Sequence, residues 1–480
     1  MDRIKRLFAG KSLRALALRG SFWLGLGSGS EYSLRFLRNI ILVRLLAPES
    51  FGLMAIVLAV NMALEAFTQV GVKEAVIQSP DGEEETYLNG AWWLSFLRSV
   101  GLFAIAIVAV PMLASFYSAG QYAGLFRFSF LAILFNGAIS ARALIAQKRM
   151  DFKKWIIISN GGGAIGILSA IALSFRLHSV WALVIGYVLE AAGRCILSFI
   201  MCPYLPKLRF RKEHKQALFK YARGIFGLPI LYIIFRQSDI FVIGKLLPKK
   251  ELGLYSMVLG LAQMPIFLVS TIINPVLMPM FSKKQHDKEW INRALLKSTK
   301  IIVLAGGPLV CFTALYGKNI LTIVYGPVYA AASLPFAILL ASTLLRSAGS
   351  PIANIYLAIG QPGLHRLFLI IRAAIMLLLI YPAVRFFGLA GAAAAGFLAE
   401  FVGYFFQVMR MRGLIVLDTR RYGAVYLHAL GISMIVFIVW LATYHISGRP
   451  LYNLLLGLAC CALAYAFMGL ITFKKYRKAA

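Results

Sequence analysis

Charged side chains interrupt a long apolar stretch near the start of the chain. Within residues 20–46, Glu31, Arg35 and Arg38 are spaced i, i+4 and i+7, which places all three on one face of a helix. A guanidinium donates two parallel hydrogen bonds to a phosphate, so arginines on such a face favour an anionic ligand. The pattern predicts a ligand-binding role for Arg35 and Arg38, and an ion-coupling or gating role for Glu31.

A second apolar stretch carries a comparable pair of charges. Residues 219–246 contain Arg236 and Asp239 at i and i+3. If the two helices face one another across a cavity, Arg236 joins the ligand-binding candidates and Asp239 the coupling or gating candidates. The alternative is structural, because Glu31 with Arg35, and Arg236 with Asp239, could be internal ion pairs that lock the helices.

Further basic residues lie within apolar stretches. A charged residue at mid-membrane costs at least about 2.5–3.5 kcal/mol, so Arg98 and Arg346 should each face a watery cavity or a partner. Both are further ligand-binding candidates. Five others lie close enough to the end of a stretch for the charge to reach the interface, namely Lys73, Arg127, Arg142, Arg194 and Arg372.

Carboxylates also occur inside the apolar stretches. Glu65 is flanked by Asn61 and Gln69, one helical turn to either side. A buried carboxylate could carry a coupling proton or bind Na⁺, whereas the alternative is an interhelical hydrogen bond. Similar polar pairs nearer the ends of their stretches are Glu190 with Arg194 and Glu400 with Gln407.

The composition explains why these charges stand out. Of the 480 residues, 60% are hydrophobic and only 14% charged, and the mean hydropathy is +0.79. A soluble domain cannot bury that much apolar surface, so the chain falls in the class of helical membrane proteins. The net charge of +32 does not indicate nucleic-acid binding, because most basic residues lie between apolar stretches. The five cysteines show no metal-ligand spacing.

Apolar runs separated by polar or Pro/Gly-containing breaks predict an all-α polytopic membrane protein with about fourteen transmembrane helices. Lys and Arg on the side of the N-terminus outnumber those on the opposite side about four to one, which predicts that both termini are cytoplasmic. The predicted spans are 20–46, 50–72, 89–116, 121–146, 155–175, 179–202, 219–246, 252–280, 298–317, 330–359, 365–385, 387–410, 422–444 and 450–473. Every connection is short, so function must lie within the helical bundle.

An internal repeat suggests how the spans are organised. Residues 44–53 (RLLAPESFGL) and 245–254 (KLLPKKELGL) share a basic-Leu-Leu start and an apolar-Gly-Leu end, and residues 116–117 are echoed by 324–325. Six spans separate the copies, which predicts two pseudo-symmetric six-helix lobes in parallel orientation around a central cavity, with two C-terminal helices appended. The predicted regions are a cytoplasmic interfacial helix (1–19), an N-lobe (20–210), a C-lobe (211–412), two further helices (413–473) and a basic cytoplasmic tail (474–480).

Specific stretches resemble a known family. Residues 19–23 (RGSFW), 36–53 (FLRNIILVRLLAPESFGL) and 324–326 (VYG) are similar to the oligosaccharide flippase, or polysaccharide transporter (Wzx-like), family of the multidrug, oligosaccharidyl-lipid and polysaccharide exporter superfamily. The resemblance implies a cargo of undecaprenyl-pyrophosphate-linked oligosaccharide. It would be flipped from the cytoplasmic to the outer leaflet of the bacterial inner membrane by alternating access, for exopolysaccharide or O-antigen biosynthesis.

The resemblance also implies roles and partners. Relatives use cavity arginines on the pyrophosphate, a role carried here onto Arg35, Arg38 and Arg236, with Arg98 and Arg346 as further candidates. It implies a monomeric, non-enzymatic transporter without a cofactor, driven by H⁺ or Na⁺, that contacts membrane lipids and works beside polysaccharide polymerase machinery.

Two alternative functions stay open at the level of sequence. A multidrug antiporter of the same superfamily would favour acids and aromatics for organic cations, whereas deep arginines outnumber deep carboxylates here. A membrane-embedded polysaccharide polymerase or ligase would need a carboxylate site for activating an acceptor or a sizeable external loop, and the sequence shows neither.

Overall fold

The computed structural model describes residues 13–67, 71–117, 120–149, 151–208, 228–264, 274–415, 417–444, 451–459 and 462. Over these residues the regular structure is entirely helical. The basic segments predicted at 1–12 and 474–480, and the connection at 209–227 that would join the predicted lobes, lie outside the described residues. The chain divides into two compact units, Met1–Gly253 and Leu254–Ala480, and the predicted domain boundaries stay predictions.

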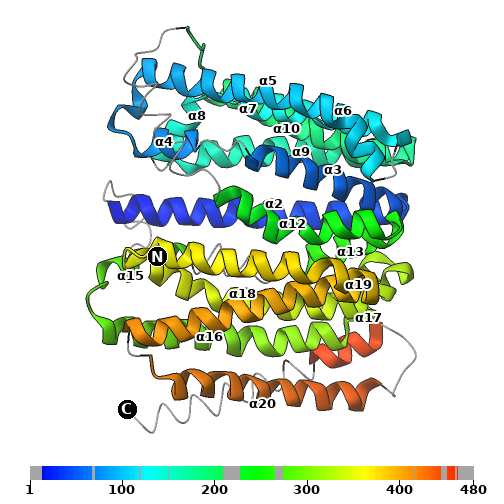
Figure 1. Ribbon diagram of the computed structural model, residues 1–480, viewed down its shortest axis with the longest axis vertical. Coiled ribbons are helices and arrows are strands. Elements are labelled where there is room, and N and C mark those ends of the chain that lie inside the picture. Colours follow the sequence, from blue (N-terminus) through cyan, green and yellow to red (C-terminus); the bar gives the residue numbers. More distant parts are fainter. Residues whose placement is uncertain are drawn as a thin grey trace. The chain divides into compact units, whose positions relative to one another are not determined.

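The first unit holds the helices that carry most of the candidate residues (Figure 1). They are α2 (Leu13–Leu45), α3 (Pro48–Phe67), α4 (Val72–Gln78), η1 (Pro80–Glu83), α5 (Glu85–Phe116), η2 (Gly120–Tyr122), α6 (Ala123–Ser129), α7 (Leu131–Gly137), α8 (Arg142–Lys148), α9 (Phe152–Leu177), α10 (Val180–Met201), α12 (Leu228–Leu246) and the start of α13 (Lys249–Ala262).

Glycines bring α9 and α10 together into a tight hairpin. A methyl group added at Gly166 would lie 2.7 Å from the carbonyl oxygen of Gly186, and one added at Gly186 would lie 2.8 Å from that of Gly166. The turn between the two helices is made by His178, which adopts the left-handed conformation with φ 45°. Small residues at an interface let helix backbones approach closely, so this hairpin forms a rigid support for α2, which packs against α9.

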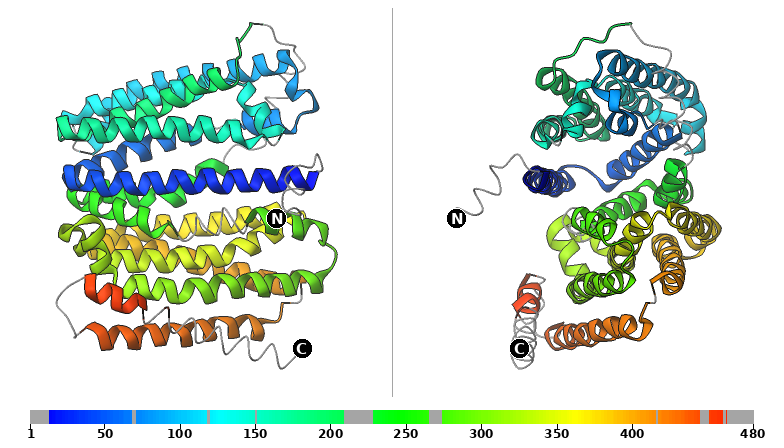
Figure 2. Two further views of the ribbon diagram at one scale, coloured as in Figure 1. Left: turned by 180° about the vertical axis from the view of Figure 1, so that it is seen from behind. Right: turned by 90° about the vertical axis from the view of Figure 1, so that its left-hand side faces the viewer.

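The second unit contains the remaining described helices (Figure 2). They are α15 (Asn274–Lys283), α16 (Lys288–Leu315), α17 (Gly317–Tyr325), η4 (Pro327–Ala332), α18 (Ser333–Ala358), α19 (Pro362–Ile415) and α20 (Thr419–Tyr444), followed by helical residues 451–459. Fully buried side chains such as Phe281, Ile352 and Tyr356 form the core among α15, α16, α18 and α19.

Helix α19 is itself a hairpin. Gly388 has φ 57° and ψ −135°, which breaks the helix into two halves at the point where the sequence predicts a boundary between spans 387–410 and 365–385. Side chains other than glycine rarely adopt positive φ, so this residue permits the reversal. Both units therefore contain a long antiparallel helical hairpin, α9–α10 in the first and α19 in the second.

The chain is a multi-pass membrane protein. Among the described residues, eight helices are long and apolar enough to span a bilayer, or nine if the bent pair Gly120–Gly137 and Arg142–Lys148 forms one span. These two segments meet at an angle of 62°. The charged helix α2 is not among the eight, and the predicted total of about fourteen spans stays a prediction.

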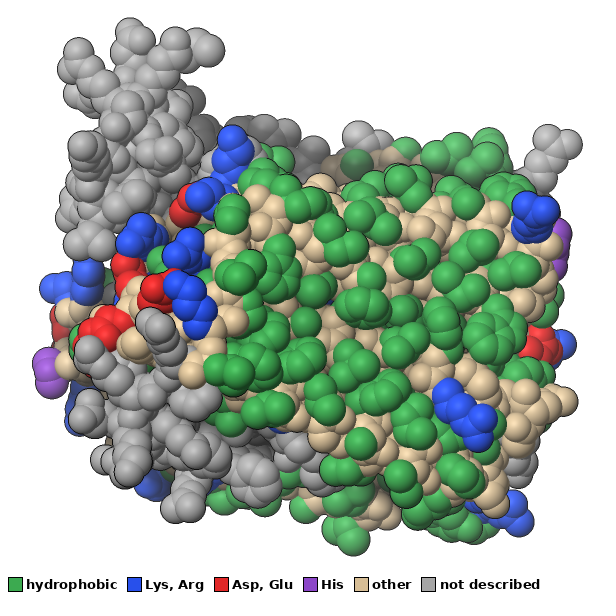
Figure 3. Space-filling model, turned by 90° about the horizontal axis from the view of Figure 1, so that it is seen from above, with side chains coloured by type: hydrophobic (Ala, Val, Ile, Leu, Met, Phe, Trp, Pro, Cys, Tyr) green, Lys and Arg blue, Asp and Glu red, His purple; other side chains and the backbone are tan. Residues whose placement is uncertain are grey.

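One face of the first unit shows the membrane character directly. Figure 3 shows apolar side chains covering the middle of this face, with acidic and basic side chains gathered at the end where η1 and α8 lie. On α5, Ile105, Val108 and Met112 are exposed at helical spacing. Large apolar side chains on one exposed helix face indicate contact with lipid.

The repeated sequence motif has a structural role within the first unit. The two copies meet there: Gly52 packs against the carbonyl oxygen of Lys249, and Gly253 packs against that of Pro48. Because each glycine sits at the same motif position, the contact is reciprocal, as in an interface with local two-fold symmetry. A side chain at either position would collide with backbone, which explains why both copies of the motif carry glycine.

Candidate functional site

Two residues of the predicted face of α2, Glu31 and Arg35, form a group with Glu190 and Arg194 of α10. We call this group the Glu190 cluster. Arg35 donates to Glu31 Oε1 at 3.0 Å and to Glu190 Oε1 at 2.5 Å, both through Nη2. Arg194 donates to the same Glu190 oxygen. Two guanidinium groups from two helices therefore converge on one carboxylate oxygen.

Local packing fixes this geometry. Asn160 of α9 donates to the Gly27 carbonyl at 2.8 Å and to Ser30 Oγ at 2.9 Å, which holds α2 one turn before Glu31. A methyl group at Gly162 of α9 would lie 2.8 Å from the backbone nitrogen of Arg194. The absence of a side chain at Gly162 thus leaves room for Arg194 to cross over α9.

The Glu190 cluster is partly open. The side chains of Arg35 and Arg194 are 30% and 28% exposed, while that of Glu190 is 9% exposed. Two arginines and two carboxylates give the cluster a formal charge of zero. Charges within a membrane-spanning bundle are expected to be paired or to face a wet cavity, and this cluster shows the first and retains partial exposure.

A second polar group lies between other helices of the first unit. Glu65 of α3 accepts a hydrogen bond from Asn136 of α7 at 3.1 Å, and it interacts electrostatically with Arg98 of α5. Asn61, one turn before Glu65, donates to Ser129 Oγ at 3.0 Å. The predicted polar stripe on α3 therefore faces neighbouring helices; its third member, at position 69, lies outside the described residues.

The structure places the other predicted residues of this unit as follows. Arg38 donates to Asn39 Oδ1 at 3.0 and 3.2 Å. On α12, the Arg236 guanidinium lies over the Tyr232 ring at 5.9 Å, and Asp239 is buried and accepts from the backbone N–H of Ile240 at 2.8 Å. Helix α12 packs against α3.

Arg346 belongs to a group in the second unit that we call the Glu400 cluster: Arg346, Arg372, Glu400 and Gln407. Glu400 lies 3.6 Å from Arg346 Nε and 3.3 Å from Arg372 Nη2, and Arg372 also donates to Gln407 Oε1 at 2.9 Å. The Glu400 side chain is 1% exposed and that of Arg372 10%. The expectation that Arg372 reaches the interface is wrong, because its charge is paired with Glu400 inside the unit.

A group of tyrosines lies beside Gln407 in the same unit. Tyr356 donates to the Gln407 carbonyl at 2.8 Å, and the hydroxyl of Tyr404 bonds to those of Tyr422, at 2.6 Å, and Tyr426. All but Tyr426 are buried. The tyrosine hydroxyls bond to one another, whereas both Glu400 oxygens are buried and, among the described residues, interact with Arg346 and Arg372 as ion pairs without a hydrogen bond. Because a carboxylate buried in this way depends on its two counter-charges, this cluster has a structural character that the Glu190 cluster lacks.

The hairpins that carry Glu190 and Glu400 correspond residue by residue. The pattern Gly-x-x-x-Glu-x-x-Gly occurs at 186–193 and again at 396–403, and the turn residues His178 and Gly388 have the same 210-residue offset. The turns that lead into the hairpins match as well, because Asp151 N–H bonds to the Ala146 carbonyl as Gln361 N–H does to that of Tyr356, both at 2.8 Å. This second repeat was the signal in the sequence that could have singled out both carboxylates.

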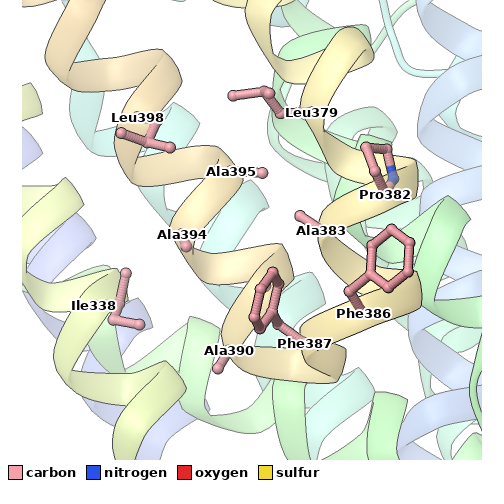
Figure 4. Close-up of a pocket in the computed structure, with 11 residues that line it drawn as sticks. Ile338, Leu379, Pro382, Ala383, Phe386, Phe387, Ala390, Ala394, Ala395 and Leu398 are labelled. Atoms are coloured by element: carbon pink, nitrogen blue, oxygen red, sulfur yellow. The ribbon is translucent and has the colours of Figure 1, made fainter.

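An apolar pocket lies apart from these clusters in the second unit (Figure 4). It has a volume of about 480 Å³ and is lined by Ile338 of α18 and by residues from both halves of α19, among them Phe386, Phe387 and Leu398. None of the lining residues is charged, so this pocket is not the predicted arginine-lined cavity.

Outside the membrane-spanning helices, one ion pair has a clear electrostatic effect. Arg149, beyond the end of α8, donates to Glu83 of η1 at 2.5 Å. This hydrogen bond holds the pKa of the Glu83 carboxyl below its usual range. Over the described residues, no group of three or more His, Cys, Asp and Glu side chains could hold a metal ion.

Comparisons with known proteins agree with the resemblance seen in the sequence. Residues 41–334 match the family described as "Polysaccharide biosynthesis protein". The chain is 28% identical over 292 residues to the succinoglycan biosynthesis transport protein ExoT of Rhizobium meliloti (strain 1021), a match that covers 60% of this chain and 58% of that protein, less than two thirds of its length. It is 22% identical over 354 residues to the lipopolysaccharide biosynthesis protein WzxC of Escherichia coli (strain K12), covering 72% and 71%.

Two solved structures have a similar fold. An inward closed conformation of the lipid II flippase MurJ superposes with a TM-score of 0.79 at 13% identity, covering 94% of this chain and 99% of that one. An inward-facing multidrug resistance transporter of the MATE family, in the MOP superfamily, superposes with a TM-score of 0.64 at 14% identity, covering 80% and 95%. At these identities the likeness shows the fold alone.

Proposed function

The chain belongs to the polysaccharide biosynthesis protein family, and on that premise we propose that it flips a lipid-linked oligosaccharide across the membrane. The names of its relatives support this function, since one is a transport protein for succinoglycan biosynthesis and another serves lipopolysaccharide biosynthesis. The fold shared with a lipid II flippase is consistent with it.

The observation that carries the proposal is a set of arginines inside the helical bundle. Arg35 and Arg194 present partly exposed guanidinium groups at one point on the first unit. A diphosphate can accept several charge-assisted hydrogen bonds from guanidinium groups, which are stronger than those that a neutral cargo could accept, and a cationic cargo would be repelled by their charge. This argues for a flippase with an anionic lipid head group and against a transporter of cationic drugs.

The finer steps extend this proposal. The cargo is undecaprenyl-pyrophosphate-linked oligosaccharide, moved from the cytoplasmic to the outer leaflet of the inner membrane by alternating access. The transporter works as a monomer of about fourteen spans, in two six-helix lobes plus two helices around a central cavity, with both termini in the cytoplasm. Polysaccharide polymerase machinery takes over the cargo on the outer face.

Residue roles follow the same reasoning. Arg35, Arg38 and Arg236 bind the pyrophosphate, with Arg98 and Arg346 as further contributors. Their partial exposure supports this role. Glu31, Glu65 and Asp239 serve H⁺ or Na⁺ coupling or gating, supported by their positions on membrane-embedded helices next to polar groups.

The test is translocation of a fluorescent lipid-linked oligosaccharide in proteoliposomes that hold the full chain. Arg35→Ala and Arg236→Ala should each slow translocation by about tenfold or more, because a charge-assisted hydrogen bond contributes about 1.5–3 kcal/mol. Arg385→Ala, which removes an exposed arginine on α19, is the matched control and should leave the rate unchanged. Wild-type rates in both cavity variants would contradict the proposal, and efflux of an organic cation in place of the lipid would favour a drug antiporter.

A further inference from the structure

Arg35 and Arg194 converge on a single oxygen of Glu190. Each guanidinium donates through Nη2 to Oε1 of Glu190, so two donors from different helices point at one atom. Several guanidinium donors on one oxygen is the arrangement that phosphate oxygens commonly receive in proteins. We propose that Arg35 and Arg194 form a diphosphate-binding site in which Glu190 holds the place of a phosphate oxygen, and that the cargo displaces it. The identity of the cargo rests on the proposed function above.

The site is built and accessible. Gly162 leaves room for Arg194 to cross α9, and Asn160 ties α2 to α9 beside Glu31. The side chains of Arg35 and Arg194 are 30% and 28% exposed, so a ligand can approach both. In the Glu400 cluster Arg346 is comparably exposed, at 27%, but Arg372 is only 10% and Glu400 only 1% exposed, so a ligand cannot approach both arginines there.

Charge balance explains why binding must displace Glu190. Glu31, Arg35, Glu190 and Arg194 sum to zero, so a diphosphate would add its full negative charge to a neutral group. With Glu190 still between the arginines, two anions would compete for the same Nη2 groups at close range. Rotation of the Glu190 side chain away from the arginines removes this repulsion and frees both donors.

The same exchange explains release. A binding site on a transport path must hold its cargo strongly enough to capture it and weakly enough to let it leave. When Glu190 returns to the arginines, it competes with the diphosphate and lowers the affinity. Glu190 is therefore a positioning residue that sets how tightly the site binds, and Arg194 is a ligand-binding residue in addition to Arg35.

Calorimetric titration of inorganic pyrophosphate into the purified full chain in nanodiscs tests this. Glu190→Gln should bind pyrophosphate about tenfold more tightly, equivalent to about 1.4 kcal/mol, which is near the lower end of coupling energies for close charge pairs. Arg35→Ala and Arg194→Ala should each weaken binding by about tenfold or more. Glu31→Gln should tighten binding by a smaller factor, because Glu31 pairs with Arg35 but, among the described residues, not with Arg194.

Glu74→Gln is the matched control, because it removes one carboxylate from α4 of the same unit and so makes the same change in net charge. Its affinity for pyrophosphate should equal that of wild type. The inference is overturned if Glu190→Gln binds no more tightly than Glu74→Gln, or if Arg194→Ala binds like wild type. If Glu190→Gln does not fold, Arg194→Lys serves as the test variant, because it keeps the positive charge but loses the two parallel N–H donors of the guanidinium. Wild-type affinity for pyrophosphate in Arg194→Lys would then overturn the inference.

Translocation in proteoliposomes separates this inference from the proposed function. Glu190→Gln should move lipid-linked oligosaccharide more slowly than wild type while binding pyrophosphate more tightly. If wild type moves no lipid-linked oligosaccharide but the pyrophosphate affinities change as expected, the site stands and the proposed cargo is wrong. If wild type transports and the affinities do not change, the exchange at Glu190 is wrong and the function stands.

Discussion

The hairpins α9–α10 and α19 have the same turn and glutamate positions, but the surroundings of the glutamate differ between them. In both, a residue at positive φ reverses the chain, and a glutamate twelve positions later, Glu190 or Glu400, accepts two arginines. In the first hairpin, Arg194 of α10 packs over Gly162 of α9. In the second hairpin the geometry is swapped, because Arg372 of the first half crosses over Gly403 of the second.

The difference lies in what covers the carboxylate. Glu190 pairs with two partly exposed arginines, whereas Glu400 pairs with the nearly buried Arg372, which is also bonded to Gln407, and with Arg346, which is partly exposed. A repeated carboxylate at the same position therefore supports exchange with a ligand in one hairpin and rigidity in the other. Accessibility, rather than residue type, separates a binding cluster from a structural one.

The largest expected effect tests whether Glu400 is structural. Glu400→Gln should lower the free energy of unfolding by about 3–5 kcal/mol, because it leaves Arg372 and Arg346 without their buried counter-charge. Glu190→Gln should cost only about 1 kcal/mol, since its arginine partners are partly solvated. Thermal unfolding in detergent, monitored by circular dichroism, compares the two; equal losses would remove the distinction between the clusters.

The glycine beneath each arginine gives the next effect. Gly162→Ala should destabilise the protein by about 1–3 kcal/mol, because the new methyl group would lie 2.8 Å from Arg194 N and 3.0 Å from the Glu190 carbonyl, both backbone atoms. Its neighbour Gly163 has open space, so Gly163→Ala should be neutral or stabilise by up to about 1 kcal/mol. A chemical-denaturation series that ranks the two variants equally would contradict the close packing of α9 on α10.

Substitutions at the two turn residues, Gly388 and His178, should have smaller effects on stability. Gly388→Ala should cost about 1–2 kcal/mol, because φ 57° with ψ −135° lies outside the conformations open to alanine. His178→Gly should change stability by no more than about 1 kcal/mol, since relief of left-handed strain is offset by the greater freedom of the unfolded chain. The melting temperatures of the two variants check this order, with Gly396→Ala as a control within an open helical position.

The smallest effect concerns the entrance to each hairpin. The lowered pKa of Glu83 means that its pairing with Arg149 stabilises the fold above the carboxyl's unfolded pKa and is lost as pH falls through the lower, folded pKa. Between about pH 5 and pH 3, wild type should lose slightly more stability than Arg149→Gln. The residues before α19 that correspond to positions 149–151 are Ile359, Gly360 and Gln361, and none of them ionises. Gln361→Ala should therefore leave the pH dependence of stability unchanged.

Much of the fold followed from the sequence because its signals are local. Apolar runs longer than the bilayer is thick identified a multi-pass membrane protein, and the motif at 44–53 with its copy at 245–254 identified the family resemblance and a repeat. The pairing of Glu31 with Arg35 was available as an alternative because i, i+4 neighbours meet on any helix.

The partners of the candidate residues could not be predicted in the same way. Glu190 lies 155 positions from Arg35, and Arg372 was expected at the interface because its distance from the end of an apolar stretch was the sole guide. Helical periodicity states which side chains share a face, but it does not state which other helix that face meets. Glu190, Arg194 and Glu400 lie nearer the ends of their apolar stretches, and on that ground the sequence placed them outside the candidate site.

The sequence by itself determined that the chain is a helical membrane protein with arginines buried among apolar residues, since hydropathy and helical spacing are properties of short segments. Only the tertiary structure decided which of those charges are open and which are enclosed. That decision depends on glycines at helix contacts: Gly403 lets Arg372 cross to the second half of α19 and reach Glu400, and Gly162 leaves room for Arg194, which reaches Glu190 one turn earlier on its own helix. Packing between segments distant in the chain sets the exposure of each charge, and exposure determines what the charge can bind.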